Sequence, residues 1–477
     1  MCSPFPYLIQ WILDMPEISH KTTMCMKALG AVLLFCVGVC GVNAETWRVE
    51  PTIHTATYVS DNIDRTNTGQ SVGGIFLVRP GVKLVGKGRR LTVDLDYELD
   101  AALFVGSDFG NQLTHNLDAT SKLELLRKRL YVDAGASVSQ VTVSGSGRLS
   151  EGSLTPKQDN IDTQYSYYFS PYWVQRFGSL ANGLLRLGFE DTMYDDNSSA
   201  DSQSYTVDAG LSSGRDFQMF RWSYRYHREE NHHDTRKNRI TGYSLGSLSY
   251  YMSSQFYLQA QVGKDLNSYS FGGSDNVYWY SGFGWRPSRR TFLSVLYGDR
   301  SFGDSYQVTF NRVFRRLTVG LNYSESVQSG VNSRLEPNAA QVTDRTIYIG
   351  PYINKSGTFR VKYQQRRTLW SSEIYWYSRD FQIGTEFDET IYGTKLAVQR
   401  QIRRDIQGDA YIRYQNSEFD DLNNTFNHFY VGQVALTKDL YKNTKVSVGY
   451  LFSRQGSNKA ANRYLENRVY TSMDILF

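Results

Sequence analysis

Apolar and polar residues alternate one by one along most of this chain. In the clearest run, residues 91–101, the odd-numbered positions are apolar and the even-numbered ones from Thr92 to Asp100 are polar or acidic. The same period of two recurs in residues 130–139, 220–227, 317–324, 409–415 and 446–452. Strict alternation over such lengths is typical of β-strands with one apolar and one polar face. A helical period is almost absent, so the pattern predicts an all-β protein.

The segments between the expected strands alternate in length. Short connections include residues 127–129 and 315–316, whereas long polar ones include residues 61–73, 144–162 and 328–344. Membrane barrels have short periplasmic turns and long outer loops. The pattern therefore predicts a transmembrane antiparallel up-and-down β-barrel, with a long outer loop also at residues 229–237.

The alternative is a soluble β-repeat protein, which would bury Leu, Ile and Val between its sheets. Here aromatic residues gather near the ends of the expected strands, where a membrane barrel places its girdles of Tyr, Phe and Trp. The runs in question are 165–169, 220–226, 278–280 and 375–377. Their placement favours the membrane barrel.

The strand number can be bounded, because a barrel with both termini on one side needs an even number of strands. About 23 segments qualify as strands, and we therefore expect about 22, within a range of roughly 18–22. The uncertain region is 345–367, where two segments flank residues 354–357. It forms either one long strand or an inward excursion.

The N-terminal region has the composition of an export signal. Lys21 and Lys27 precede the apolar run 28–42, and Val42 and Ala44 occupy the −3 and −1 positions of a cleavage site. We expect residues 1–44 to be a signal peptide and residues 45–477 to form the barrel. An N-terminal membrane anchor is the alternative, although the apolar run is short for a span. The start site is also open, since either Met24 or Met26 could begin the signal.

The cysteines agree with export. All four precede residue 45, at positions Cys2, Cys25, Cys36 and Cys40. Cleavage after Ala44 would leave a chain without thiols, which avoids disulfide chemistry in an oxidising compartment.

The C-terminal residues alternate as well. Met473, Ile475 and Phe477 share one face of an amphipathic final strand that ends in an aromatic residue. Such an ending resembles the assembly signal of bacterial outer-membrane barrels. We therefore expect the outer membrane of a Gram-negative bacterium as the location, with outer-membrane lipid and the barrel-assembly machinery as partners.

Composition excludes other classes. An aromatic content of 14% is the opposite of a disordered signature. The net charge of +5 comes without a run of Lys or Arg, so no nucleic-acid partner is expected.

In a barrel the polar face of each strand points into the lumen. The expected pore-lining residues are Asp94, Asp96, Glu98, Asp100, Arg221, Arg225, Arg360, Lys362, Arg366 and Arg413. Acidic and basic walls could select polar solutes, as charged rings do in pores. Alternatively, these side chains form ion pairs with one another and only solvate the lumen.

Candidate catalytic and metal-binding residues are few. His227, His232 and His233 lie near Glu229 and Glu230 in the expected outer loop, but their spacing matches no established metal site. His428 near Asp420 and Asp421, and His115 near Asp108, could be drawn as acid–base pairs, yet nothing in the spacing supports a catalytic constellation. We predict no enzyme activity, no catalytic or metal-binding residue and no cofactor.

The N-terminal third resembles a known family. Residues 47–53 (WRVEPTI), 58–62 (YVSDN), 88–97 (GRRLTVDLDY), 113–119 (LTHNLDA) and 130–134 (LYVDA) are similar to the PEP-CTERM/exosortase-associated outer-membrane β-barrel family. The resemblance covers roughly residues 45–140. It implies a role in exopolysaccharide production and export, with exopolysaccharide and its export proteins as partners, and it supplies no catalytic residue.

Together these patterns predict a porin-like conduit, or an outer-membrane component of exopolysaccharide biosynthesis or export. Two alternatives stay open. One is a non-conducting structural or glycan-binding surface barrel, and the other is a barrel enzyme. Conductance would separate the first alternative from the conduit.

Overall fold

The computed structural model describes residues 44–477, apart from gaps in several connections. The gaps are residues 109, 144–145, 150–159, 196–200, 234–235, 268–276, 329–351, 382–387 and 422–423. Of the expected signal peptide only Ala44 is described, so that expectation lies outside the described residues.

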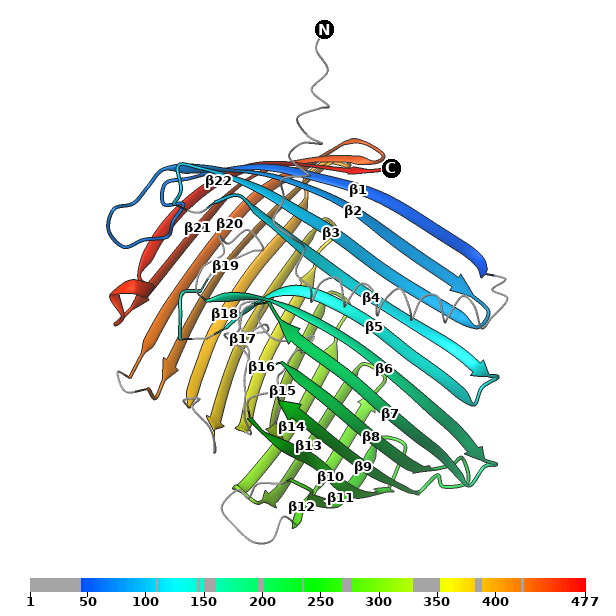
Figure 1. The fold of residues 1–477 in the computed structure, drawn as a ribbon. Helices are drawn as coiled ribbons and strands as arrows, with labels where there is room; N and C mark the ends of the chain where they lie inside the picture. The colour runs from blue at the N-terminus through cyan, green and yellow to red at the C-terminus, as the bar shows by residue number, and fades with distance from the viewer. Residues whose placement is uncertain are drawn as a thin grey trace.

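In the part of the chain that the structure describes, one antiparallel sheet of 22 strands closes on itself (Figure 1). Each strand pairs with its neighbour in sequence, beginning with β1 (Ala44–Ser60) and β2 (Gly73–Gly88). Closure comes from β22 (Tyr464–Leu476), which pairs with β1 from Thr52 opposite Leu476 to Ser60 opposite Arg468. The predicted up-and-down barrel and its strand number are confirmed. Closure leaves no open sheet edge along this seam for lipid to meet.

The strands between these three follow in chain order. They are β3 (Leu91–Val105), β4 (Gln112–Leu126), β5 (Leu130–Thr142), β6 (Ile161–Phe177), β7 (Ala181–Tyr194), β8 (Ser202–Ser213), β9 (Phe220–His233), β10 (Arg236–Tyr251), β11 (Phe256–Asp265), β12 (Val277–Ser288), β13 (Thr291–Arg300), β14 (Gly303–Val313), β15 (Leu317–Gln328), β16 (Tyr352–Gln364), β17 (Thr368–Phe381), β18 (Glu389–Gln401), β19 (Ile406–Phe419), β20 (Phe426–Tyr441) and β21 (Thr444–Ser457). A short 3-10 turn, η1 (Ala460–Asn462), precedes β22. No helix in the described part of the chain is long and apolar enough to cross a membrane.

Connections after even-numbered strands are short, and most of those after odd-numbered strands are longer. Because short turns lie at the periplasmic end of such barrels, the odd-numbered strands end at the outer rim. The expected outer loop at 229–237 is wrong, since β9 continues to His233 and β10 begins at Arg236. Residues 354–357 lie inside β16, so this part of the uncertain region is one continuous strand.

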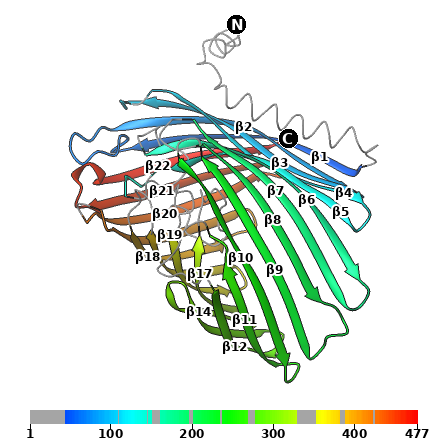
Figure 2. The same ribbon diagram turned by 60° about the horizontal axis from the view of Figure 1, so that its bottom comes forward.

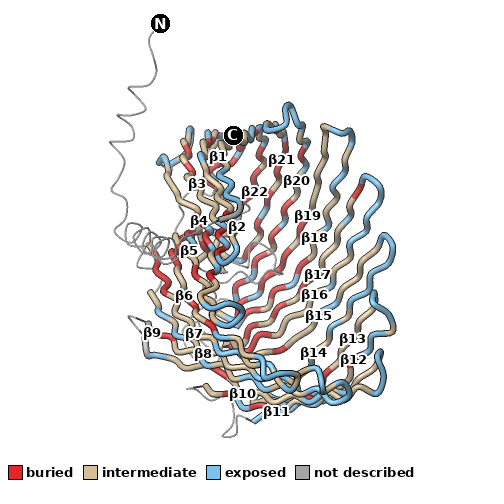
Figure 3. The backbone as a smooth tube through the Cα atoms, turned by 90° about the vertical axis from the view of Figure 1, so that its right-hand side faces the viewer, coloured by how far each residue is buried: buried red, intermediate tan, exposed pale blue. Residues whose placement is uncertain are grey.

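The two faces of the wall differ in chemistry, as the last strand shows. Val469 and Met473 point outward and are exposed, whereas Glu466 and Arg468 point into the lumen and are buried. Figure 3 shows buried positions recurring along the strands and exposed ones gathering at the turns. An apolar outer surface over a polar interior is the arrangement that lipid requires of a barrel.

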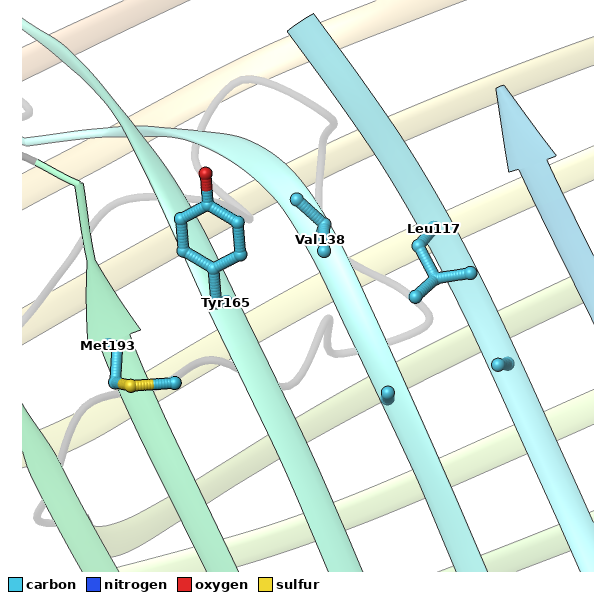
Figure 4. Packing of buried hydrophobic residues seen from close by; sticks show 6 residues of the cluster. Leu117, Val138, Tyr165 and Met193 are labelled. Atoms are coloured by element: carbon cyan, nitrogen blue, oxygen red, sulfur yellow. The ribbon is translucent and has the colours of Figure 1, made fainter. Parts of the chain in front are cut away.

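An outward-facing apolar row crosses β4–β7 (Figure 4). Leu117 pairs with Val138, Val138 with Tyr165 and Tyr165 with Met193, and all four side chains are buried. Directly opposed side chains of this kind are the unit of sheet stabilisation. The row therefore joins four strands through side-chain packing as well as backbone hydrogen bonds.

The aromatic runs do not all form girdles. Tyr278 and Tyr280 of β12 are buried on the lumen side, and the Tyr280 hydroxyl lies 2.8 Å from the Ser305 hydroxyl. Tyr375 and Tyr377 of β17 are likewise buried in the lumen wall. The girdle prediction is wrong for these four residues, because side chains of a strand point alternately to the two faces of the wall. In β12, for example, Trp279 faces outward, and the tyrosines on either side of it face the lumen.

Candidate functional site: the lumen

The acidic ladder of β3 forms part of the lumen wall. Arg79 of β2 donates a hydrogen bond of 2.9 Å to Asp100, and Lys83 Nζ lies 3.8 Å from Asp96. Glu98 is 3.6 Å from Arg79, whereas Asp94 is exposed. Most of the ladder is thus paired with basic groups on the adjacent strand, so the charges of this wall largely offset each other locally.

A second ion pair lies on β16 and β17. Arg360 donates to Glu373 at 2.7 Å, and both side chains are partly exposed to the lumen. Lys362 shares the face of Arg360 and is exposed. Arg366 lies in the exposed turn after β16, outside the strands, because β16 ends at Gln364. It is therefore not part of the lumen wall.

The remaining predicted cations occupy three different environments on the lumen side. Arg221 stacks over the Tyr251 ring at 4.4 Å, and Arg225 on the same face of β9 is exposed. Arg413 is buried and lies 5.5 Å from the centre of the Phe429 ring. Only Arg221 and Arg225 of these three are open to lumenal water.

A short piece of the connection between β5 and β6 enters the barrel, and we call residues 146–149 the inserted segment. The side-chain amides of Asn427 and Asn462 donate to the Ser146 carbonyl at 3.3 and 2.7 Å. Gln455 donates to the Gly147 carbonyl at 3.1 Å and accepts from the Leu149 amide at 2.8 Å. These bonds attach the inserted segment to β20–β22.

Apolar contacts complete this attachment. The Leu149 side chain is buried against Phe429, Val431, Leu451 and Tyr464. The Tyr464 hydroxyl donates to the Leu149 carbonyl at 2.8 Å. Since β1–β4 separate β5 from β22 around the ring, the inserted segment crosses the lumen side of these strands near the outer rim.

A buried charge cluster lies beside the inserted segment. Glu466 accepts hydrogen bonds from Arg65 at 3.0 Å, from Arg468 at 2.6 Å and from the Ser60 hydroxyl at 2.7 Å. Burial alone would lower the pKa of Arg65, but the charge of Glu466 beside it raises that pKa above its ordinary value. The cluster joins the β1–β2 connection, which contains Arg65, to the closing strand.

The histidines are dispersed. His227 Nδ1 lies 2.6 Å from Asp208 in the lumen wall, whereas His232 faces outward and lies 3.2 Å from Glu230. His115 contacts the Tyr97 hydroxyl. His428 contacts the Tyr414 hydroxyl. Within the described ranges, no three His, Cys, Asp or Glu side chains form a group that could hold a metal ion.

Comparisons with known proteins identify the fold. No family profile and no curated protein matches the chain. Among solved structures, the FrpB iron transporter from Neisseria meningitidis has a TM-score of 0.56 at 10% identity, with 93% of this chain and 83% of that chain covered. The ferric enterobactin receptor PfeA from Pseudomonas aeruginosa, in a mutant form, gives a TM-score of 0.54 at 10% identity, with 90% of this chain and 80% of that chain covered. At such low identity the likeness concerns the fold. The chain has the fold of outer-membrane β-barrels.

Sequence reasoning missed the inserted segment and its attachment site. The side-chain amides that hold it lie about 300 residues away along the chain. They belong to Asn427, Gln455 and Asn462, and Gln455, for example, is 308 residues from Gly147. Asn427 near the start of β20 and Gln455 near the end of β21 lie on the polar face of their strands, whereas Asn462 belongs to η1 before β22. Alternation identifies that face but not the partner it meets.

Proposed function

We propose that the barrel is a porin-like conduit for a polar glycan, acting as an outer-membrane component of exopolysaccharide biosynthesis or export. The link to exopolysaccharide is supported by the resemblance of residues 45–140 to the exosortase-associated barrels. The conduit is supported by the chemistry of the lumen wall, which is polar and charged along its strands.

One observation supports the conduit most directly: cations on the lumen face are open to water. Arg225 and Lys362 are exposed on β9 and β16, and neither has a hydrogen bond or ion pair with another described residue. A wall built only to fill the lumen would pair or bury such groups. Free lumenal cations act on passing solutes as the charged rings of pores do.

Passage would be diffusion or guided movement along a wall of hydroxyl, amide and paired ionic groups. The β2–β3 pairs hold opposite charges 2.9–3.8 Å apart, so they offer donors and acceptors with little net field. Such a surface exchanges hydrogen bonds with a hydroxyl-rich polymer without holding it strongly.

The second candidate is a non-conducting surface barrel that binds glycan. It is favoured by the inserted segment, whose hydrogen bonds to β20–β22 hold it near the outer end of the lumen. In this alternative the segment would close the path, and the glycan would bind at the outer rim.

Single-channel recording of the refolded mature chain in planar bilayers separates the two. We expect stable, ion-selective conductance from the conduit. In the double variant Arg225→Glu with Lys362→Glu, ion selectivity should move towards cations, because two lumenal positive charges become negative. The matched control is Arg366→Glu, whose position in an exposed turn should give a much smaller shift.

Absence of conductance from a barrel that is correctly folded, as judged by heat-modifiable migration in gels, would contradict the conduit and favour the glycan-binding barrel. If the double variant conducts with the same ion selectivity as the unmodified barrel, these cations do not act on the permeating ions.

A further inference from the structure

A cavity of about 400 Å³ opens in the lumen wall between β9 and β15. In Figures 1 and 2 these strands lie across the barrel from β1 and β22. Its volume is within the range of small-molecule sites. Most of its lining side chains are polar or aromatic, and those used below are Asp265, Tyr278, Arg300, Gln261, Gln307 and Glu229.

An ion pair forms the floor of this cavity. Arg300 of β13 lies 2.7 Å from Asp265 of β11, and their side chains are only 10% and 4% exposed. The Arg300 guanidinium stacks over the Tyr278 ring at 4.4 Å. Side chains of three adjacent strands, β11, β12 and β13, therefore hold this ion pair in place.

The wall is shaped to hold Tyr278 in this position. A Cβ at Gly263 would lie 2.3 Å from the Tyr278 ring, so the ring lies against the bare backbone of β11. Tyr278 is thus held between Gly263 and Arg300. Such a layered arrangement fixes the guanidinium plane before any ligand arrives, which lowers the entropic cost of binding.

Two atoms of the ion pair have no hydrogen-bond partner in the part of the chain that the structure describes. They are Nε of Arg300, a donor, and Oδ2 of Asp265, an acceptor. A buried polar group without a partner destabilises the fold, and in native proteins nearly all such groups are satisfied by protein or by ordered water. A hydroxyl group fits both atoms, because it accepts one hydrogen bond while donating another.

The surrounding charges determine which ligand fits. Arg300 is already neutralised by Asp265, and Glu229 adds a further carboxylate to the lining. The amides of Gln261 and Gln307 add donors and acceptors without charge. His227 also lines the cavity, but it is already paired with Asp208. An anionic ligand would therefore meet Glu229 and two basic groups that already have carboxylate partners, whereas a neutral polyhydroxylated ring would meet only complementary partners.

We propose that this cavity is a subsite for a neutral sugar unit, with a ring hydroxyl bound by Asp265 and Arg300. The inference rests on the conduit proposed above, because the subsite belongs to the same lumen, and it narrows the cargo to a glycan containing neutral sugars. A sugar held at one side of the lumen would be guided past the β2–β4 wall opposite.

The test is titration calorimetry of the refolded barrel in an amine-oxide detergent, which has no sugar headgroup. The probes are neutral gluco-, manno- and galacto-oligosaccharides, with oligogalacturonate as the anionic comparison. We expect saturable binding of a neutral oligosaccharide. Asp265→Asn with Arg300→Gln should weaken it about tenfold or more, because charge-assisted hydrogen bonds are lost.

Gly263→Ala provides a second variant, which displaces Tyr278 while both charges remain, and it too should weaken binding. The matched control is Arg228→Gln with Glu230→Gln, an ion pair on the outward face of β9 whose loss should leave binding unchanged. All variants are first checked for heat-modifiable folding.

Three results would each overturn the subsite. They are equal binding in all folded variants, stronger binding of oligogalacturonate than of the neutral sugars, and no saturable binding. The last result would mean that water alone occupies the cavity. The two proposals fail separately. Sugar binding without conductance would retain the subsite and reject the conduit, whereas conductance without sugar binding would do the reverse.

Discussion

At the scale of single residues, the side of the wall on which a residue lies determines what it does. Tyr278, Trp279 and Tyr280 are neighbours in sequence, yet the two tyrosines line the lumen and the tryptophan faces outward. Glu466 is a second example, since its inward position places it between Arg65 and Arg468. Neither environment can be read from residue type alone.

Removal of the Glu466 charge tests the buried cluster. Glu466→Gln leaves Arg65 and Arg468 buried without their carboxylate, so we expect a loss of about 3–5 kcal/mol in the free energy of unfolding. Urea titration of the barrel in micelles, followed by tryptophan fluorescence, measures this loss. Glu373→Gln is the control, because its partly exposed pair with Arg360 should contribute only about 0–1 kcal/mol. Equal losses in the free energy of unfolding for the two variants would contradict the expectation that the buried cluster contributes more to stability than the partly exposed pair.

At the scale of elements, the strands follow from local pattern but the inserted segment does not. Residues 91–101 and 446–452 alternate strictly, and both lie within observed strands. The inserted segment is held by distant side chains, chiefly Gln455 and Tyr464, whose hydrogen bonds end on its backbone. Backbone groups do not depend on side-chain identity, so the sequence of the segment contains little information about its attachment.

Loosening of the inserted segment should change conductance. Gln455→Ala with Tyr464→Phe removes three hydrogen bonds to the segment, each of about 1 kcal/mol. The released fraction should rise about tenfold or more, which single-channel records would show as more frequent or larger openings. Gln433→Ala is the control, since this lumenal residue of β20 bonds to Tyr470 instead. Unchanged openings would mean that the segment does not obstruct the path.

At the scale of the whole molecule, the barrel depends on its closure and on the contrast between its two faces. The seam between β1 and β22 is formed by residues at opposite ends of the chain, and the Phe477 amide donates to the Pro51 carbonyl at 2.9 Å beside it. The outward positions Met473 and Ile475 are consistent with the predicted assembly signal, whose recognition stays a prediction.

Adjacent residues of β21 test the contrast between the faces. Val448 faces outward and is exposed, whereas Ser447 lies on the lumen side beside Thr437. Val448→Lys should cost about 2 kcal/mol or more in lipid, and Ser447→Lys should cost much less, because its ammonium reaches lumenal water. Reversible urea unfolding in lipid vesicles measures both. A larger loss for Ser447→Lys would contradict the assignment of faces.

The sequence by itself determined that the chain forms a barrel and which face of each strand is polar, and it limited the number of strands to about 18–22. These properties follow from a period of two and from connection lengths, which are local. Only the tertiary structure decided which polar groups meet. Arg79 pairs with Glu98 and Asp100 of the acidic ladder, and Arg366 lies outside the wall. The cavity around Asp265 and Arg300 takes its lining from β9–β15. These contacts depend on the strand register, on where each strand ends and on the course of an inserted loop. Each of these features depends on residues far apart along the chain.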